Sequence, residues 1–108
     1  MIGRADFVFT IGYEGNTAVV DGSLKRKYGS FDTGELADKG LFKQALCSAV
    51  YELAGRPEAK PAQGEDPLEK VLAIYNLHTE SRLGSVEELK RTFGVFEVPE
   101  AVARVLVI

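Results

Sequence analysis

The stretch from residue 41 to 55, LFKQALCSAVYELAG, limits the possible folds of this chain more than any other part of it. Its apolar side chains recur at steps of three and four residues, which is typical of an amphipathic helix that ends at Gly55. The expected apolar face consists of Phe42, Ala45, Leu46, Ala49, Val50 and Leu53. The expected polar face consists of Lys43, Gln44, Ser48 and Glu52. Such a helix needs a second layer of structure to cover its apolar face.

The N-terminal part of the chain has the composition of β-strands. Residues 5–11, ADFVFTI, and 17–20, TAVV, are rich in β-branched and aromatic side chains, and YEGN between them predicts a turn at Gly15-Asn16. Asp21-Gly22 predicts a second hairpin-type turn. Residues 23–29 alternate like a third strand of a meander, which we favour, although a short helix that pairs Leu24 with Tyr28 is the alternative.

Helical signals dominate after residue 32. One helix is expected from a cap at Thr33 to a stop at Gly40. A second begins at Asp66 and Pro67, where Glu69 completes a capping box, and its apolar face runs to residue 77. A third runs from Ser85, with Glu88 in its capping box, to Gly94.

Two segments are less regular. Residues 56–65, RPEAKPAQGE, predict a polar loop or linker, and whether it divides two subdomains stays open. Residues 99–108 predict a short helix, with a final strand that pairs with the N-terminal strands as the alternative. We therefore expect one α+β domain over 1–108. It has a β-rich part (1–32, a small antiparallel hairpin or meander), a helical part (33–55), the loop, and a second helical part (66–108), and three to five helices follow the β-rich part.

Composition supports a single globular domain. The chain has 108 residues, of which 45% are hydrophobic and 27% charged, so it can form a real core. The net charge of -3 weighs against a dedicated binder of polyanions. One cysteine cannot form an internal disulfide, and no run approaches the ~20 apolar residues of a membrane span. We expect a soluble, cytoplasmic protein without a membrane partner.

The glycines in FVFTIGYEGNTAVVDG do not match a known phosphate-binding or nucleic-acid-binding loop. The G-x-x-G spacing of GYEG occurs in KH domains, but there it joins two helices, and Glu14 would repel phosphate. No Lys-Ser/Thr pair follows the glycines as in a P-loop, and no helix follows as in a dinucleotide-binding loop. The stretch therefore predicts a hairpin, in which Gly15 adopts a positive φ angle.

Cys47 and His78 are the only thiol and the only imidazole in the sequence, so they are the candidates for a catalytic pair. Cys47 lies beside an apolar helix face and His78 continues the apolar face of the next helix, positions at which packing is the usual role. One Cys and one His fall short of a zinc site, and no carboxylate pair stands out as general acid and base. We expect no cofactor and no metal, and a non-catalytic role is favoured.

Two features suggest nucleic-acid binding as an alternative. LKRKY places Lys25, Arg26 and Lys27 beside Tyr28, and such a cluster can contact phosphate or stack on a base. It can equally form the solvated edge of a sheet. Residues 85–106 resemble the helix pair of small DNA-binding domains, but Arg104 would be the only strong base-reading side chain of the second helix.

The C-terminal segment carries a surplus of apolar side chains for its length. These are Phe96, Val98, Val102, Val105 and Ile108. Exposed apolar groups of this number favour contact with another protein surface. The sequence therefore predicts a small interaction or accessory module that binds itself or another protein. A nucleic-acid-binding regulator is the alternative, and an enzyme or small-ligand binder with an unrecognised site is the second alternative.

Overall fold

A computed structural model of the chain describes residues 2–54, 66–95, 97–99 and 101–108. Within these residues the fold is α+β, as expected, with six helices and three strands. In chain order they are α1 (Arg4–Val8), β1 (Thr10–Glu14), β2 (Thr17–Val20), α2 (Gly22–Tyr28), α3 (Thr33–Asp38), α4 (Phe42–Ala54), α5 (Pro67–Thr79), α6 (Val86–Phe93) and β3 (Arg104–Val107). The predicted loop at 56–65 and the predicted helix end at Gly55 lie outside the described residues.

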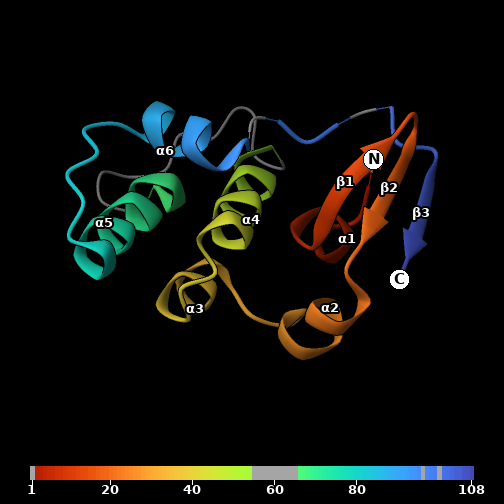
Figure 1. The fold of residues 1–108 in the computed structure, drawn as a ribbon, viewed down its shortest axis with the longest axis horizontal. Coiled ribbons are helices and arrows are strands. Elements are labelled where there is room, and N and C mark those ends of the chain that lie inside the picture. The colour runs from red at the N-terminus through yellow and green to blue at the C-terminus, as the bar shows by residue number, and fades with distance from the viewer. Residues whose placement is uncertain (1, 55–65, 96, 100) are drawn as a thin grey trace.

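The three strands form one mixed sheet in the order β1-β2-β3 (Figure 1). β1 and β2 form the predicted antiparallel hairpin, in which Thr17 pairs with Glu14. Gly15 has a φ of 61°, so the expected positive φ in the turn is confirmed. β3 runs parallel to β2, and its first residue, Arg104, also pairs with Thr17. The end of the chain therefore completes a sheet that begins near residue 10.

The prediction of a strand over 5–11 was wrong for residues 5–9, because α1 occupies Arg4–Val8 and β1 starts only at Thr10. Phe7, Val8 and Phe9 are all buried, each at most 5% exposed. Three consecutive buried side chains must be surrounded by other parts of the protein. α1 meets this need by packing against α4 and β2. Tertiary burial here overrides the β-propensity of the aromatic and β-branched residues.

The third strand of a meander at 23–29 was also wrong, because these residues form α2. Asp21 is the N-cap, and its carboxylate accepts a hydrogen bond from the backbone N–H of Leu24 at 3.1 Å. Asp21-Gly22 is therefore a helix start and not a hairpin turn. A capping aspartate outweighs a short alternation of three apolar or long side chains.

The four later helices α3 to α6 confirm the helical predictions. Asp32, rather than Thr33, caps α3 through a capping box with Glu35. Asp66 caps α5 by accepting a hydrogen bond from Leu68 N, and Ser85 caps α6 by accepting one from Glu88 N. The hydrogen bond that Glu69 was predicted to accept in the capping box of α5 is not among the described contacts. α3 and α6 end near Gly40 and Gly94, each of which has a positive φ.

The short helix predicted for 99–108 is not formed, and the alternative strand β3 is present instead. The helix pair predicted for residues 85–106 therefore lacks its second helix. β-branched residues fit a strand, and the open side of β2 supplies partners for the backbone. The long-range hydrogen bonds to β2 therefore outweigh the local helix signal at Pro99.

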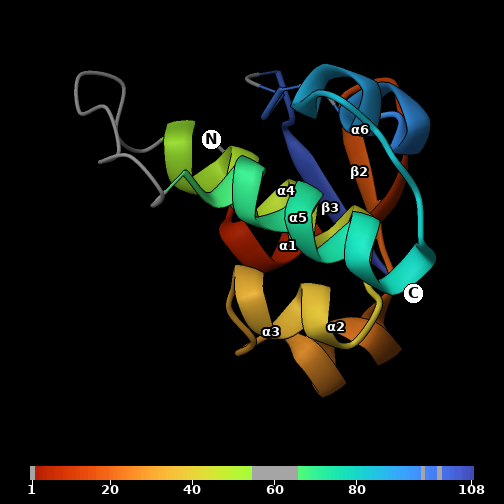
Figure 2. The same ribbon diagram turned by 90° about the vertical axis from the view of Figure 1, so that its left-hand side faces the viewer.

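α4 is the central element of the core. It packs against α1 on the side of the sheet and against α3 and α5 on the other side, and Figure 2 shows α5 and α4 in front of the strands. Residues 45–50 are all buried, including Ser48, which was expected on the polar face. Ser48 tolerates burial because its hydroxyl bonds to Arg4 and Thr33, both at 2.8 Å.

None of the described helices is long and apolar enough to cross a membrane.

Candidate functional site

Exposed large apolar side chains gather on the sheet. Of the seven such residues in the described ranges, six lie on β1, on β3 or directly after β3. These six are Ile11 (53% exposed), Tyr13 (47%), Val105 (40%), Leu106 (52%), Val107 (48%) and Ile108 (65%). The seventh, Leu77, lies on α5. Because such side chains are normally scattered singly over a surface, this concentration makes the sheet the candidate functional site.

The pairing register shows which face each residue of β3 occupies, since neighbours in adjacent strands point to the same face. Val105 and Val107 pair with the buried Ala18 and Val20, and so lie on the face toward the core. Leu106 pairs with Val19 and points to the opposite face. Both faces of β3 are therefore apolar and exposed. Figure 1 also shows no described element beyond the outer edge of β3.

Within the described residues, one edge of β3 has no backbone partner. On the other edge, Arg104 N and Ile108 N donate to carbonyls of Asn16 and Val20, and Ile108 O accepts from Gly22 N at 2.9 Å. In a parallel pair the residues that bond to one neighbour alternate along the strand. The N–H and C=O groups of Val105 and Val107 therefore point away from β2, toward solvent.

The other edge of the sheet, β1, is a poorer template for a further strand. Its pairing with β2 contains an irregularity between Thr10 and Gly12, and β1 ends on the charged Glu14. Bulges and charges are the usual devices that protect an edge strand. β3 has neither a bulge nor a proline, and its only charge is Arg104 at its start.

The predicted interaction residues are divided between two places. Val105 and Ile108 lie at the exposed end of the sheet. Val98 and Val102 are half-buried against the core, and Phe96 lies outside the described residues. Sequence reasoning missed Leu106 and the apolar residues of β1 as surface groups. A signal was available, because residues 104–108, RVLVI, have the β-branched composition of a strand, but it was outweighed by the helix signals before them.

A cleft with a volume of about 300 Å³ lies between β1, α4 and the segment after α6. Its lining consists of Phe7, Thr10, Ile11, Gly12, Tyr13, Lys43, Cys47, Gly94, Val95 and Glu97. Burial raises the pKa of the Cys47 thiol from 9.0 to about 11, against the opposing effect of Lys43. Burial also raises the pKa of Tyr13, which the Thr10 hydroxyl counteracts and Cys47 reinforces. Both groups are therefore neutral near pH 7, which suits packing better than nucleophilic attack.

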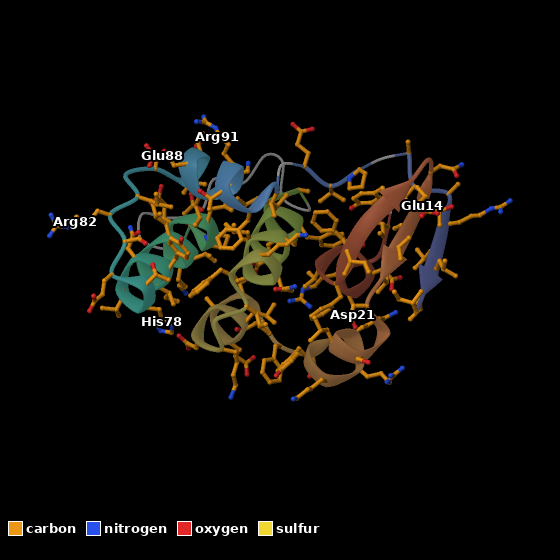
Figure 3. The ribbon with its side chains drawn as sticks, in the orientation of Figure 1. Glu14, Asp21, His78, Arg82, Glu88 and Arg91 are labelled. Carbon is orange, nitrogen blue, oxygen red and sulfur yellow. The ribbon has the colours of Figure 1, made fainter. Side chains whose placement is uncertain are left out.

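His78 does not line this cleft. It is exposed near the end of α5, where its ring packs edge-on against Phe42 with centroids 5.9 Å apart. Figure 3 shows it at the α5 end of the molecule, remote from the sheet. The structure thus places Cys47 and His78 in different environments, and a catalytic pair of these two residues gains no support from the geometry.

The reactivity of Cys47 provides a direct test of its environment. At pH 8 we expect iodoacetamide to modify the native protein about 100-fold more slowly than the unfolded chain. The reason is that a thiol with a pKa of about 11 has roughly a hundredth of the thiolate of a thiol with a pKa of 9.0. Since the unfolded thiol ionises near pH 9 and the folded one near 11, stability should fall as pH rises between these values. In Cys47→Ala, stability should decrease less than in the wild type over this pH range. Equal alkylation rates in native and unfolded protein would contradict this assignment.

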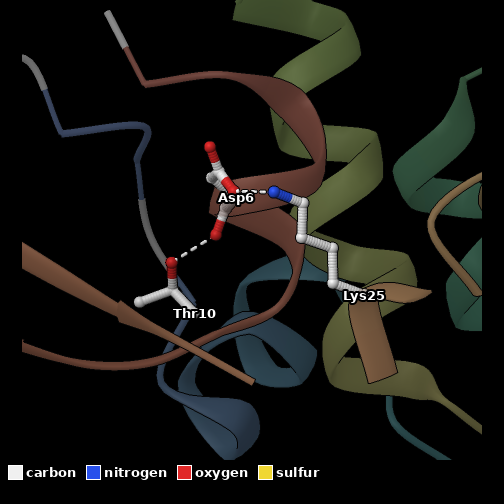
Figure 4. Close-up of polar contacts among 3 residues, drawn as sticks. All are labelled: Asp6, Thr10 and Lys25. Carbon is white, nitrogen blue, oxygen red and sulfur yellow. Dashed lines mark hydrogen bonds and ion pairs between the residues drawn. The ribbon is translucent and has the colours of Figure 1, made fainter. Parts of the chain in front are cut away.

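The basic cluster is spread around α2 rather than gathered on one surface. Lys25 Nζ forms an ion pair with Asp6 Oδ1 at 2.6 Å, which joins α2 to α1 (Figure 4). Lys27 Nζ lies 5.3 Å from the ring centroid of Tyr28, and Arg26 is exposed. Successive helical residues point about 100° apart. Nucleic-acid binding by these residues stays a prediction, with one of its three cations already engaged by a carboxylate.

The described residues contain no group of three or more His, Cys, Asp or Glu side chains that could hold a metal ion. The free edge of β3 is thus the feature with the most definite chemistry: an unpaired row of backbone donors and acceptors between apolar side chains. Comparison of the chain with protein-family models, curated proteins and solved structures finds no match to any of them.

Proposed function

We propose that this protein is a non-catalytic interaction module that binds an extended segment of a protein partner by strand addition at β3. The observation that carries the proposal is the exposure of every residue of β3, together with its free backbone edge. An added strand gains main-chain hydrogen bonds from the sheet edge and side-chain contacts from the residues that flank it. The same surface explains why apolar residues are concentrated at this end of the chain.

The expected energies fit a specific complex of moderate strength. Val105 and Val107 together offer two donors and two acceptors, and each hydrogen bond contributes about 1 kcal/mol net. Each apolar pair across the new strands adds about 0.2–1 kcal/mol. Leu106 and Ile108 on the outer face, 52% and 65% exposed, would lose part of their contact with water to the side chains of a strand added beside them.

Leu106→Lys tests the proposal, with Leu77→Lys as the matched control. Both variants place the same charge at an exposed leucine, but Leu77 lies on α5, away from the sheet. We expect Leu106→Lys to weaken binding of protein partners at least about tenfold, because an ammonium in an apolar strand pair must be desolvated. Leu77→Lys should bind as the wild type does.

The measurement is retention of partner proteins from a cell extract on each immobilised protein, followed by amide exchange on the recovered complexes. The amides of Val105 and Val107 should exchange more slowly in the complex than in the free protein. Circular dichroism confirms that both variants are folded. Equal retention by the two lysine variants, or unchanged exchange at Val105 and Val107, would show that partners bind elsewhere.

A further inference from the structure

We infer that the partner of β3 is a second copy of this chain, and that the two β3 strands pair antiparallel about a two-fold axis through Leu106. This inference rests on the proposed function and gives it a specific partner. The joined sheets would have six strands in the order β1-β2-β3-β3-β2-β1. Three features of the sheet support it: the positions of the free backbone groups of β3, the position of the charge on β3, and the irregular edge of β1.

The free backbone groups select one register. Val105 and Val107 point their N–H and C=O groups to the open edge, whereas Arg104 and Ile108 are bonded on the β2 side. When Val105 of one copy lies opposite Val107 of the other, both residues of both copies exchange hydrogen bonds, and every free group of the pair finds a partner. A shift by two residues in either direction leaves half of these groups without one. The favoured register places Leu106 opposite Leu106 of the second copy.

The charge of the strand favours antiparallel over parallel self-pairing. Arg104 is the only charged residue of β3 and lies at its start. In the antiparallel register each Arg104 lies opposite Ile108 of the other copy, so the two guanidinium groups stand at opposite ends of the paired strands. Parallel pairing would set them side by side, where like charges directly opposite destabilise a sheet. The remaining cross-strand pairs are Leu–Leu and Val–Val, which are favourable.

The form of β1 explains why such pairing would stop at two copies. After two β3 strands pair, the outer edges of the joined sheet are the β1 strands of the two copies. β1 carries the irregularity between Thr10 and Gly12 and ends on Glu14, and both features discourage a further strand. A two-fold contact between identical surfaces is closed, so it yields a dimer and not a fibre.

Cross-linking through single cysteines tests the register. Leu106→Cys should oxidise to a disulfide-linked dimer, because a non-hydrogen-bonded antiparallel pair has Cα atoms about 4.5 Å apart, within the disulfide range. Val105→Cys should not, because its counterpart in the other copy is displaced by two residues, which puts the Cα atoms beyond about 7 Å. Leu77→Cys serves as the exposed control, and the wild type shows the background from the buried Cys47.

Sedimentation velocity of the purified wild type, Leu106→Lys and Leu77→Lys over a wide concentration range completes the test. We expect wild type and Leu77→Lys to reach the dimer, and Leu106→Lys to need at least about tenfold more protein, because two lysines would then face each other on the axis. A wild type that stays monomeric, or a Leu106→Cys that cross-links no faster than Leu77→Cys, overturns the second-copy inference. The proposed strand addition has a separate test. It is contradicted if no bound partner slows the amide exchange of Val105 and Val107.

Discussion

Replacement of Arg4 with methionine is expected to lower the unfolding midpoint of this protein by about 10 °C, the largest effect of any single polar substitution that we predict. The Arg4 guanidinium donates to Phe31 O at 2.7 Å, to Ser48 Oγ at 2.8 Å and to Gly29 O at 3.4 Å. Hydrogen bonds to a charged group contribute about 1.5–3 kcal/mol, and their loss would leave the partly buried carbonyl groups of Gly29 and Phe31 without this donor. One side chain thus joins α1 to α4 and to the segment between α2 and α3.

The same network continues beyond Arg4. Ser48 Oγ lies 2.8 Å from Thr33 Oγ1, which in turn donates to Glu52 Oε2 at 3.3 Å. Arg82→Met is the matched control, because Arg82 is exposed and Figure 3 shows it pointing into solvent. Thermal and urea unfolding of both variants give the comparison. A similar midpoint for Arg4→Met and Arg82→Met would mean that the Arg4 hydrogen bonds contribute no net stability.

Gly22→Ala should detach the end of β3 from the rest of the sheet. A Cβ atom on Gly22 would lie 2.6 Å from the backbone oxygen of Ile108 and 2.9 Å from Val107 Cγ1. The first neighbour is backbone and cannot rotate away, so the strand end must move and lose the bond from Gly22 N to Ile108 O. Overpacking costs about 1–3 kcal/mol, and the lost hydrogen bond adds about 1 kcal/mol.

Urea unfolding measures the total effect of Gly22→Ala, and amide exchange locates it. The amide of Ile108, which donates to Val20 O, should exchange faster in the variant, whereas amides of α4 should keep their protection. Gly84→Ala is the control, because a Cβ atom at Gly84 meets nothing within 4 Å. If both alanine variants unfold at the same urea concentration, the close approach of Gly22 to β3 has no energetic importance.

The fold could be predicted from the sequence wherever the signal is local. α4 follows from the spacing of its apolar residues, and the hairpin follows from Gly15, whose turn needs a positive φ. The burial of Ser48 could not be predicted, since its hydroxyl is satisfied by Arg4 and Thr33 from other helices. α1 was missed for a related reason: whether ADFVF forms a strand or a helix depends on what packs around it.

The candidate site could be predicted only in part. The apolar surplus at the C-terminal end was visible, and Val105 and Ile108 are indeed exposed. Which of these residues face solvent depends on which face of the sheet the helices cover, and no local pattern contains that information. Leu106 was missed because its exposure follows from pairing with Val19, a residue at the other end of the chain.

The parallel pairing of β2 with β3 also bears on the order of folding. Thr17 and Arg104 are neighbours in the sheet although most of the chain separates them, so the loop between them must close before β3 can dock. The β1-β2 hairpin and the helices α2 to α6 have local signals in the sequence, and we expect them to form first. Until β3 arrives, both sides of an apolar strand and the open side of β2 are exposed. A nascent or slowly folding molecule would therefore face the risk of pairing with the wrong chain at the same edge that we propose for its function.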